Sequence, residues 1–295
     1  MRIKSCIKSM RLRTLPLSLA GIVAGLAISL NYGGLNTELV ISLVLTTALL
    51  QILSNLSNEL GDTLNGTDTA ERQGIHYSLQ DGEISIAEMK ALIAATAILC
   101  CISGLLMIFF SFGTIFALEP LLLVLLGAAA VWAAMNYTLG KNPYGYRGKG
   151  DYFVFIFFGL VSVLGAAYIC THSFSPLWLL PATAIGCWSV GVLNVNNIRD
   201  MKTDAATRTT VAIKLGIKRA RIYQTILICV GWALLISFSL IAFKRAALYS
   251  YILTLPLFAL HLKGVWTKQD KDLDPMLPLL VMSTFATSLL MLILG

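Results

Sequence analysis

Charged residues are scarce in this 295-residue sequence. They make up 13% of the chain, whereas 57% of its residues are hydrophobic and the mean hydropathy is +0.79. A soluble domain carries about a quarter charged residues, so the composition excludes a soluble globular fold and predicts an integral membrane protein. No Pro- or Ser-rich linker divides the chain. We therefore expect residues 1–295 to form a single transmembrane domain.

Cysteine motifs are absent as well. Six cysteines are present, but none belongs to a CxxC or Cys/His pattern, and most lie within apolar runs. The sequence therefore predicts neither a zinc site nor a disulfide framework. The first apolar run, residues 15–30, contains no small-residue cleavage site, so we expect a membrane span there rather than a cleavable signal.

Long apolar runs dominate what is present. Runs of about twenty apolar residues predict an all-α integral membrane fold, a bundle of nine transmembrane helices. Gly21 and Gly25 in the first run form a small-xxx-small pair, which favours close helix packing. The predicted spans are 14–31, 39–58, 88–112, 118–138, 151–171, 176–195, 221–243, 246–262 and 276–294.

The basic residues divide unevenly between the two sides of these spans. Of 22 Lys and Arg residues, 20 fall in the N-terminal segment or in loops that follow even-numbered spans, and only Lys244 and Arg245 fall on the other side. The positive-inside rule then predicts a cytoplasmic N-terminus and an external C-terminus. The net charge of +7 thus indicates topology in a cell inner (plasma) membrane and contact with its lipid bilayer, and no nucleic-acid partner is expected.

Two clusters of Asn and Asp end the second and sixth predicted spans. A spacing of four residues places such side chains on one face of an α-helix. Four crossings separate the clusters, so both are predicted to face the cytoplasm. One such cluster is explained by polar residues at a helix end, but two with matched spacing favour a functional site. The members are Asn58, Asp62 and Asp68 in the first cluster, and Asn196, Asp200 and Asp204 in the second.

The chemistry of these clusters suits a magnesium–diphosphate site. Mg²⁺ prefers oxygen ligands, and it would relieve the repulsion between the acids. Arg and Lys residues of the adjoining loops complement phosphate oxygens. With the diphosphate as leaving group, these cations would stabilise its charge, and the apolar bundle would shelter an allylic carbocation from water. The basic residues concerned are Arg72, Arg199, Lys202, Arg208 and Lys214.

With these motifs the chain resembles the UbiA superfamily of intramembrane prenyltransferases, and within it the branch that acts on 1,4-dihydroxy-2-naphthoate. The resemblance spans nearly the whole chain. The paired Asp motifs are typical of the superfamily, whereas Asn142-Pro-Tyr-Gly-Tyr-Arg147 and Asn196-Asn-Ile-Arg-Asp200 favour the naphthoate branch. The matching stretches are 11–16, 55–68, 142–147, 153–160, 196–200 and 209–216.

This resemblance implies nine transmembrane helices with an active-site cap on the cytoplasmic side. It also implies transfer of a polyprenyl chain from polyprenyl diphosphate to 1,4-dihydroxy-2-naphthoate, with release of diphosphate and CO₂, to give demethylmenaquinone. Asp62, Asp200 and Arg72 would be catalytic, and the six residues of the two clusters would hold the Mg²⁺ cofactor. The expected substrate-binding residues are Arg72, Tyr146, Arg147, Lys149, Arg199, Lys202 and Arg208.

The chain departs from the family pattern in two places. Members usually have Asn-Asp where this chain has Asn58-Glu59, so the carboxylate is one methylene longer. The loop after the second span commonly carries a second basic residue after Arg72, where this chain has Tyr77. Diphosphate binding from this loop is therefore expected to depend on Arg72 alone, or on His76.

Several alternatives remain at this point. Hydroxybenzoate and haem-type transferases of the same superfamily are close competitors, and an interfacial belt explains the Tyr146–Lys149 loop as well as acceptor binding does. A divalent-cation transporter would carry ionisable residues at mid-membrane, where these spans have almost none. A CDP-alcohol phosphotransferase requires Asp-Gly-x-x-Ala-Arg, which residues 65–72 do not match. A non-catalytic scaffold leaves the matched clusters unexplained. The sequence predicts no particular oligomeric state.

Overall fold

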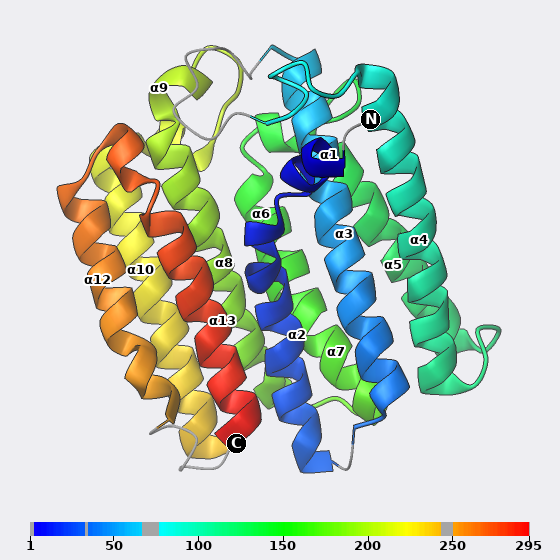
Figure 1. Cartoon of the computed structure of the whole chain (residues 1–295). Coiled ribbons are helices and arrows are strands. Elements are labelled where there is room, and N and C mark those ends of the chain that lie inside the picture. Colours follow the sequence, from blue (N-terminus) through cyan, green and yellow to red (C-terminus); the bar gives the residue numbers. More distant parts are fainter. Residues whose placement is uncertain (1–2, 33–34, 67–76, 243–249, 295) are drawn as a thin grey trace. The chain divides into compact units, whose positions relative to one another are not determined.

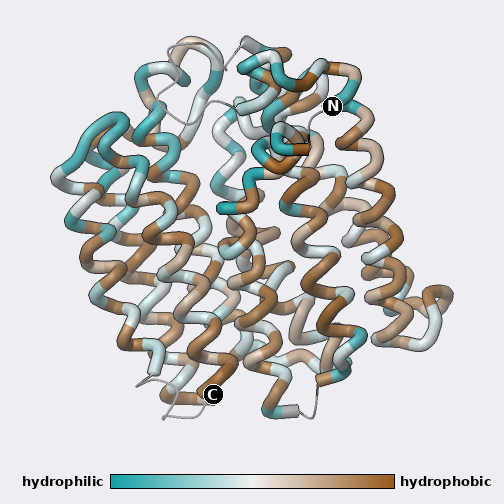
Figure 2. Tube along the Cα trace, viewed as in Figure 1, coloured by the Kyte–Doolittle hydropathy of each residue, from teal (hydrophilic) through white to brown (hydrophobic). Residues whose placement is uncertain are grey.

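The computed structural model describes residues 3–32, 35–66, 77–242 and 250–294. Within these ranges the chain is helical, apart from connecting turns and an isolated β-bridge between Arg147 and Thr209. Hydrophobic residues run along the helices (Figure 2). Eight of the described helices are long and apolar enough to cross a membrane, and a further apolar helix, Ile252–Thr267, is shorter. The predicted all-α membrane fold is confirmed.

The helices are joined mostly by short turns (Figure 1). The sixth predicted span corresponds to α8, and the fifth is built from α6, a π-helix and α7 in succession. The bounds are α1 (Ile3–Met10), α2 (Leu15–Ser29), α3 (Thr37–Leu64), α4 (Ile86–Phe112), α5 (Leu118–Asn136), α6 (Gly150–Val154), the π-helix η4 (Phe155–Val161), α7 (Ser162–Thr171), α8 (Leu179–Arg199), α9 (Met201–Asp204), α10 (Val211–Ile241), α12 (Leu255–Thr267) and α13 (Met276–Leu294).

The seventh and eighth predicted spans differ in their bounds from the helices of the structure. The seventh span was predicted at 221–243, but α10 begins at Val211 because the hydroxyl of Thr210 accepts a hydrogen bond from Ile213 N at 3.2 Å. Non-helical Gly216 interrupts α10 soon afterwards. The eighth span was predicted at 246–262; its first residues lie outside the described ranges, and the helix continues beyond the predicted end to Thr267.

The chain forms two compact units that are interleaved in sequence. Unit 1 comprises Met1–Leu15, Asn36–Gly150 and Lys202–Thr209, and unit 2 comprises Pro16–Leu35, Asp151–Met201 and Thr210–Gly295. Unit 1 therefore contains α1, α3, α4 and α5, together with a short segment that follows α8 in sequence. The single transmembrane domain expected for residues 1–295 remains a prediction.

Helix α3 is the central element of unit 1, where α1, α4 and α5 pack against it. Leu53 and Leu56 of α3 and Met89 of α4 are fully buried in the core between these helices. Helix α4 begins with a capping box, in which Ser85 N donates to the Glu88 carboxylate at 2.9 Å and Glu88 N donates to the Ser85 hydroxyl at 3.3 Å. Helix α3 is thus held by packing against its neighbours. Its last turns carry Asn58 and Asp62 of the first polar cluster.

Helix α8 is the central element of unit 2 and packs against η4, α7, α10 and α13. An aromatic cluster anchors it: the ring of Phe258 lies 4.6 Å from that of Trp188 and 5.3 Å from that of Trp232, between centroids. Such offset and edge-to-face pairs add stability beyond the area that they bury. This packing holds the helix whose end carries the second polar cluster.

Gly21 and Gly25 of α2 lie at a close contact with α7 in unit 2. A Cβ atom added to Gly21 would lie 2.3 Å from the hydroxyl oxygen of Ser162, and one added to Gly25 would lie 2.6 Å from the Cβ of Ala166. Neither position has room for a side chain. The small-xxx-small pair therefore marks close helix packing, as predicted.

Candidate functional site

Asp62 lies near the C-terminal end of α3 in unit 1, with only 4% of its surface exposed. Its carboxylate accepts a hydrogen bond of 2.8 Å from the hydroxyl of Tyr146. The guanidinium of Arg208 lies 4.0 Å from the same carboxylate and 2.5 Å from that of Asp204. Four predicted site residues, widely separated in sequence, thus meet in unit 1.

Arg208 occupies the position between two buried carboxylates. Burial opposes the charge of this guanidinium, but Asp204 and Asp62 outweigh that effect and raise the pKa of Arg208 above its usual value. Its Nε atom is buried and has no hydrogen-bond partner among the described residues. Arg208 therefore compensates both acids and keeps one donor without a protein acceptor.

The loop after α5 positions Tyr146. Gly145 N donates to Tyr137 O at 2.9 Å, and Thr209 N donates to Tyr146 O at 2.9 Å. The neighbouring Tyr144 turns the other way: its hydroxyl donates to Ala133 O at 2.8 Å, and burial together with Tyr137 raises its pKa. Within this aromatic loop, Tyr144 is a packing residue and Tyr146 contacts an acid of the predicted site.

The other residues predicted in this part of the chain are placed as follows. Asn58 is half-buried, and its amide oxygen accepts a 3.3 Å hydrogen bond from Thr138. Arg147 is exposed and donates to the side chain of Asn142, and Lys149 and Lys202 are exposed. Asp68, Arg72 and His76 lie outside the described residues.

Unit 2 contains a second arrangement of the same type around Arg199. This guanidinium is buried and binds Asp200 in a two-pronged contact, with hydrogen bonds of 2.8 and 2.6 Å. It also donates to Asp274 at 2.6 Å and to the amide oxygen of Asn196 at 2.9 Å. One buried arginine thus joins two residues of the second cluster to an aspartate more than seventy residues further along the chain.

One expectation about the second cluster is wrong. Asn196, Asp200 and Asp204 do not share the face of a continuous α-helix, because α8 ends at Arg199 and Asp200 is its C-terminal capping residue. Asp204 follows on the separate short helix α9 and belongs to unit 1. Asp side chains compete for local hydrogen bonds and disfavour helix interiors, and here Asp200 is engaged by the adjacent Arg199.

Tyr77, which stands where the family commonly has a basic residue, is itself surrounded by arginines. The guanidinium of Arg11 lies over its ring, 3.7 Å from the centroid, and Arg13 donates to its hydroxyl at 2.9 Å. Two nitrogens of Arg11, Nε and Nη2, are buried without a hydrogen-bond partner among the described residues. The loop itself has no basic residue at position 77, but two arginines of the N-terminal segment supply positive charge there.

Glu59, the other departure from the family pattern, is fully buried and links three segments of unit 1. Its carboxylate accepts hydrogen bonds from the hydroxyl of Ser9 at 3.1 Å and from Leu79 N at 2.8 Å. The longer side chain therefore connects α3 to α1 and to the segment before α4. This location explains why a glutamate fits here.

The donor set of these residues suits a hard cation. Carboxylate and amide oxygens of Asp62, Asp204, Asp200 and Asn196 already surround positive charge, supplied here by guanidinium groups. Among the described residues, no three His, Cys, Asp or Glu side chains converge on one point as a complete ligand set. Oxygen chemistry therefore fits Mg²⁺, with phosphate oxygens or water needed to complete its coordination.

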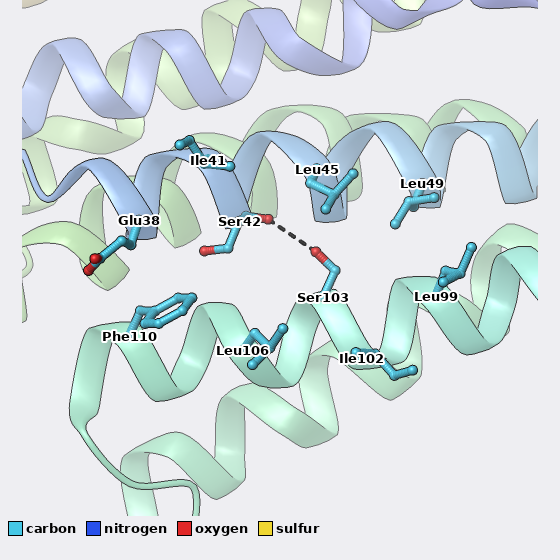
Figure 3. Close-up of a pocket in the computed structure, with 10 residues that line it drawn as sticks. All are labelled: Glu38, Ile41, Ser42, Leu45, Leu49, Leu99, Ile102, Ser103, Leu106 and Phe110. Atoms are coloured by element: carbon cyan, nitrogen blue, oxygen red, sulfur yellow. Dashed lines mark hydrogen bonds between the residues drawn. The ribbon is translucent and has the colours of Figure 1, made fainter.

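A groove of about 440 Å³ lies elsewhere in unit 1, between α3 and α4 (Figure 3). Its walls are apolar, and a hydrogen bond from the Ser103 hydroxyl to Ser42 O crosses it. Leu49, its last residue on α3, precedes Asp62 by about 20 Å of helix. The groove is thus separate from the polar cluster. Its lining comprises Glu38, Ile41, Ser42, Leu45, Leu49, Leu99, Ile102, Ser103, Leu106 and Phe110.

Some residues of these polar groups escaped prediction. Asp274 lies in a loop rich in alternating acids and lysines, which is typical of a solvated segment, so nothing in the local pattern distinguished it. Arg11 was interpreted as a topology signal, and Arg13 as a topology anchor first, with contact to phosphate as a second interpretation. Asp151 stood at the predicted boundary of a span. Its buried environment and its partner Tyr223 depend on packing between helices.

The fold and these polar groups define a class: a multi-pass helical membrane protein with aspartates, amides and buried arginines at the ends of its helices. Within that class, the chain belongs to the UbiA prenyltransferase family, which it matches over residues 18–287. The prediction of this family is confirmed.

Relatives of known activity are similar over nearly their whole length. The chain is 35% identical over 98% of its residues to the 1,4-dihydroxy-2-naphthoate octaprenyltransferase of Escherichia coli (strain K12), and covers 94% of that protein. It is 36% identical to the enzyme of the same name from Haemophilus influenzae, again covering 98% and 94% of the two chains.

Two solved structures share the fold. A UbiA homologue from Aeropyrum pernix K1 matches with a TM-score of 0.69 and 18% identity, over 97% of this chain and 96% of that one. A UbiA homologue from Archaeoglobus fulgidus bound to DMAPP and Mg²⁺ matches with a TM-score of 0.67 and 14% identity, over 98% and 99%.

Proposed function

We propose that this protein transfers a polyprenyl chain from polyprenyl diphosphate to 1,4-dihydroxy-2-naphthoate. Diphosphate and CO₂ are released, and the product is the quinol form of demethylmenaquinone, an intermediate of menaquinone synthesis. Full-length similarity to two enzymes named for this acceptor supports the assignment. The observation that carries it in the structure is the buried group in which Arg208 lies between Asp62 and Asp204 while Tyr146 holds Asp62.

Mg²⁺ is the proposed cofactor, in keeping with the Archaeoglobus fulgidus homologue solved with Mg²⁺ and a prenyl diphosphate. Its proposed ligands are Asn58, Asp62, Asp68, Asn196, Asp200 and Asp204. When bound, the ion would neutralise charge that develops on the departing diphosphate. The oxygen donors of the two clusters are of the type that Mg²⁺ prefers, which supports this assignment.

The arginines of the site would act in two ways. Arg199 and Arg208 orient the acids through short, charge-assisted contacts with Asp200 and Asp204. The buried Nε of Arg208 has a donor left for a phosphate oxygen. Arg72 and Lys202 would bind the diphosphate directly, and Arg147 and Lys149 are proposed to bind the carboxylate of the acceptor.

Arg11 and Arg13 extend this proposal. They contact Tyr77, where the family commonly has a basic residue, and Arg11 has buried hydrogen-bond donors without a partner in the described part of the chain. We therefore assign to this pair the charge that a second basic residue of the loop would supply to the diphosphate. The proposed location is the cytoplasmic side of the cell inner membrane, as the distribution of Lys and Arg predicts.

The reaction is tested with the purified full-length protein, Mg²⁺ and a polyprenyl diphosphate, offered the naphthoate or 4-hydroxybenzoate in parallel. Release of CO₂ together with prenylated product from the naphthoate alone is the expected result. Prenylation of hydroxybenzoate without CO₂ would reassign the acceptor.

The roles of the acids are tested by Asp62→Ala and Asp200→Ala. Each substitution should abolish Mg²⁺-dependent turnover while the helical circular dichroism spectrum stays unchanged. Full activity of either purified variant would remove that residue from the proposed metal site.

A further inference from the structure

Asp151 is a largely buried carboxyl group inside unit 2 for which the acid clusters give no role. It lies in the first turn of α6, and its hydrogen-bonding partner is the hydroxyl of Tyr223 on α10. Its Oδ2 atom is buried and has no hydrogen-bond partner among the described residues. Asp151 is the second residue of the apolar span Gly150–Thr171, and a buried carboxylate oxygen without a partner is unusual, because buried polar atoms are normally hydrogen-bonded.

The surroundings of this pair are apolar. Tyr223 packs with Val154 and Phe155 against Cys187, Val190 and Leu227. Among the described residues no Lys or Arg forms an ion pair with Asp151, in contrast to Asp62, Asp200 and Asp204, each of which has an arginine partner. The carboxylate therefore accepts hydrogen bonds from the Tyr223 phenol and from a backbone N–H, with no described cation paired to it, and such a group is suited to take up a proton.

The pair lies at a defined depth along α8. A Cβ added to Gly159 would lie 2.6 Å from Gly186 Cα, and one added to Gly186 would lie 2.8 Å from the ring of Phe155. Since η4 and α8 run antiparallel, Asp151, one turn before Phe155, is level with about Val190. Asn196 and Asp200 lie about 9 and 15 Å further along α8. Asp151 is thus deeper than the polar end of α8, towards the apolar part of the unit.

The backbone at this position is unusual. The helix changes from α to π over Phe155–Val161, and π-helical segments are rare and frequent at functional sites. This π-helical segment begins immediately after α6, one turn beyond Asp151. The fold therefore places a carboxyl–phenol pair below the end of the helix that carries Asn196 and Asp200.

We infer that Asp151 is the general base that accepts the hydroxyl proton of the aromatic acceptor, with Tyr223 holding its carboxylate in place. The inference rests on the proposed function. A diphosphate bound at Asn196 and Asp200 would project its allylic end towards the apolar part of unit 2. The acceptor ring must meet that end, so its hydroxyl would lie at the depth of Asp151.

The chemical step balances without any further reactant. The bond between the allylic carbon and the diphosphate oxygen breaks, and its electron pair leaves with the diphosphate. The ring carbon that bears the carboxylate bonds to the allylic carbon, while the adjacent hydroxyl becomes a carbonyl and its proton moves to Asp151. CO₂ then departs, its electron pair restores the aromatic ring through that carbonyl, and Asp151 returns the proton to the oxygen.

The experiment compares wild type with Asp151→Asn in the full-length protein, across acceptors whose hydroxyl groups are made progressively more acidic by ring substituents. General-base catalysis contributes about 10²- to 10⁴-fold, so kcat should fall by that order while the KM for polyprenyl diphosphate stays unchanged. The ratio of wild-type to variant kcat should shrink as the acceptor becomes more acidic. Tyr152→Phe, at an exposed neighbouring position, serves as the matched control and should retain wild-type kinetics.

A ratio that is constant across the acceptors, or a fully active Asp151→Asn, would overturn the inference, because a purely structural role is insensitive to acceptor acidity. Should Asp151→Asn not fold, Tyr223→Phe is judged by the same trend with a smaller loss. The ratio can be measured on any phenolic acceptor that wild type uses. If the naphthoate assignment is wrong, wild type itself will not prenylate the naphthoate. If Asp151 is not the general base, the ratio of wild-type to variant kcat will not depend on acceptor acidity, so the two failures are distinguishable.

Discussion

Arg208 and Arg199 show how single residues make buried acids tolerable in this protein. A buried carboxylate is costly unless it is paired and hydrogen-bonded. Asp204 and Asp62 share Arg208, whereas Asp200, Asp274 and Asn196 share Arg199. In each case the charge of one guanidinium is distributed over several side-chain oxygens, which offsets the cost of burying them.

Substitution of Arg208 by Ala should destabilise the protein when metal is absent. It removes the guanidinium that Asp62 and Asp204 share, and breaking a buried ion pair by removing one partner costs about 3–5 kcal/mol. Thermal unfolding in detergent should therefore occur at a lower temperature, and added Mg²⁺ should restore part of the loss. Arg219→Ala, at an exposed position, is the control and should leave the transition unchanged. Equal unfolding temperatures for the two variants would contradict this account.

Glu59→Asp should affect stability more than chemistry. The shorter side chain cannot reach both Ser9 and Leu79 N, so hydrogen bonds of 3.1 and 2.8 Å in a fully buried setting are lost. Each group left unsatisfied costs about 1–3 kcal/mol. We expect a lower unfolding temperature with the Mg²⁺ dependence of turnover unchanged. A shifted Mg²⁺ dependence would instead place Glu59 among the metal ligands.

At the scale of elements, α8 and the segment after it show how a helix end divides a motif. The four-residue spacing of Asn196, Asp200 and Asp204 resembles that of Asn58 and Asp62, and α3 does remain helical through its pair. In contrast, α8 stops at Arg199, and α9 carries Asp204 into unit 1. With the same spacing, Asn58 and Asp62 share one face of a helix, whereas Asp204 lies on a different helix from Asn196.

The contact between η4 and α8 yields a prediction about packing. A Cβ at Gly159 would lie 2.6 Å from Gly186 Cα and 2.7 Å from Ala182 O, both backbone atoms that cannot move alone. Gly159→Ala should therefore destabilise unit 2 by about 1–3 kcal/mol, measured as a lower thermal unfolding temperature. Gly165→Ala is the matched control, because nothing lies within 4 Å of the added atom. Equal stability of the two variants would contradict the close approach.

At the scale of the whole molecule, segments predicted to share one side of the membrane do contact one another within each unit. In unit 1, Lys8 pairs with Asp81 at 2.5 Å, and Tyr146 O accepts a hydrogen bond from Thr209 N. In unit 2, Arg199 pairs with Asp274. These contacts join loops that an alternating path through the bilayer would leave on the same side.

The predicted topology places the C-terminus outside. This location requires the shorter apolar helix, Ile252–Thr267, to cross the membrane. At 1.5 Å per residue, the part of this helix described as Ile252–Thr267 extends about 24 Å, less than the roughly 30 Å of a hydrocarbon core, and residues 243–249 before it lie outside the described ranges. We expect it to cross nonetheless, so alkaline phosphatase fused after Gly295 should be active and green fluorescent protein there should be dark. Fusions in the loops at Lys141 and Thr114 provide the internal and external references. The reverse pattern at Gly295 would mean that this helix does not cross.

The sequence by itself determined the membrane class, most spans and the two polar helix ends. These properties are local: apolar length decides what a bilayer accepts, and a four-residue spacing decides which side chains share a helical face. Only the tertiary structure decided the partners of each acid. Tyr146 reaches Asp62 across 84 residues, Arg199 reaches Asp274 across 75, and arginines from the N-terminal segment surround Tyr77. Such contacts depend on how helices pack, and that packing is set by many side chains together rather than by any local pattern.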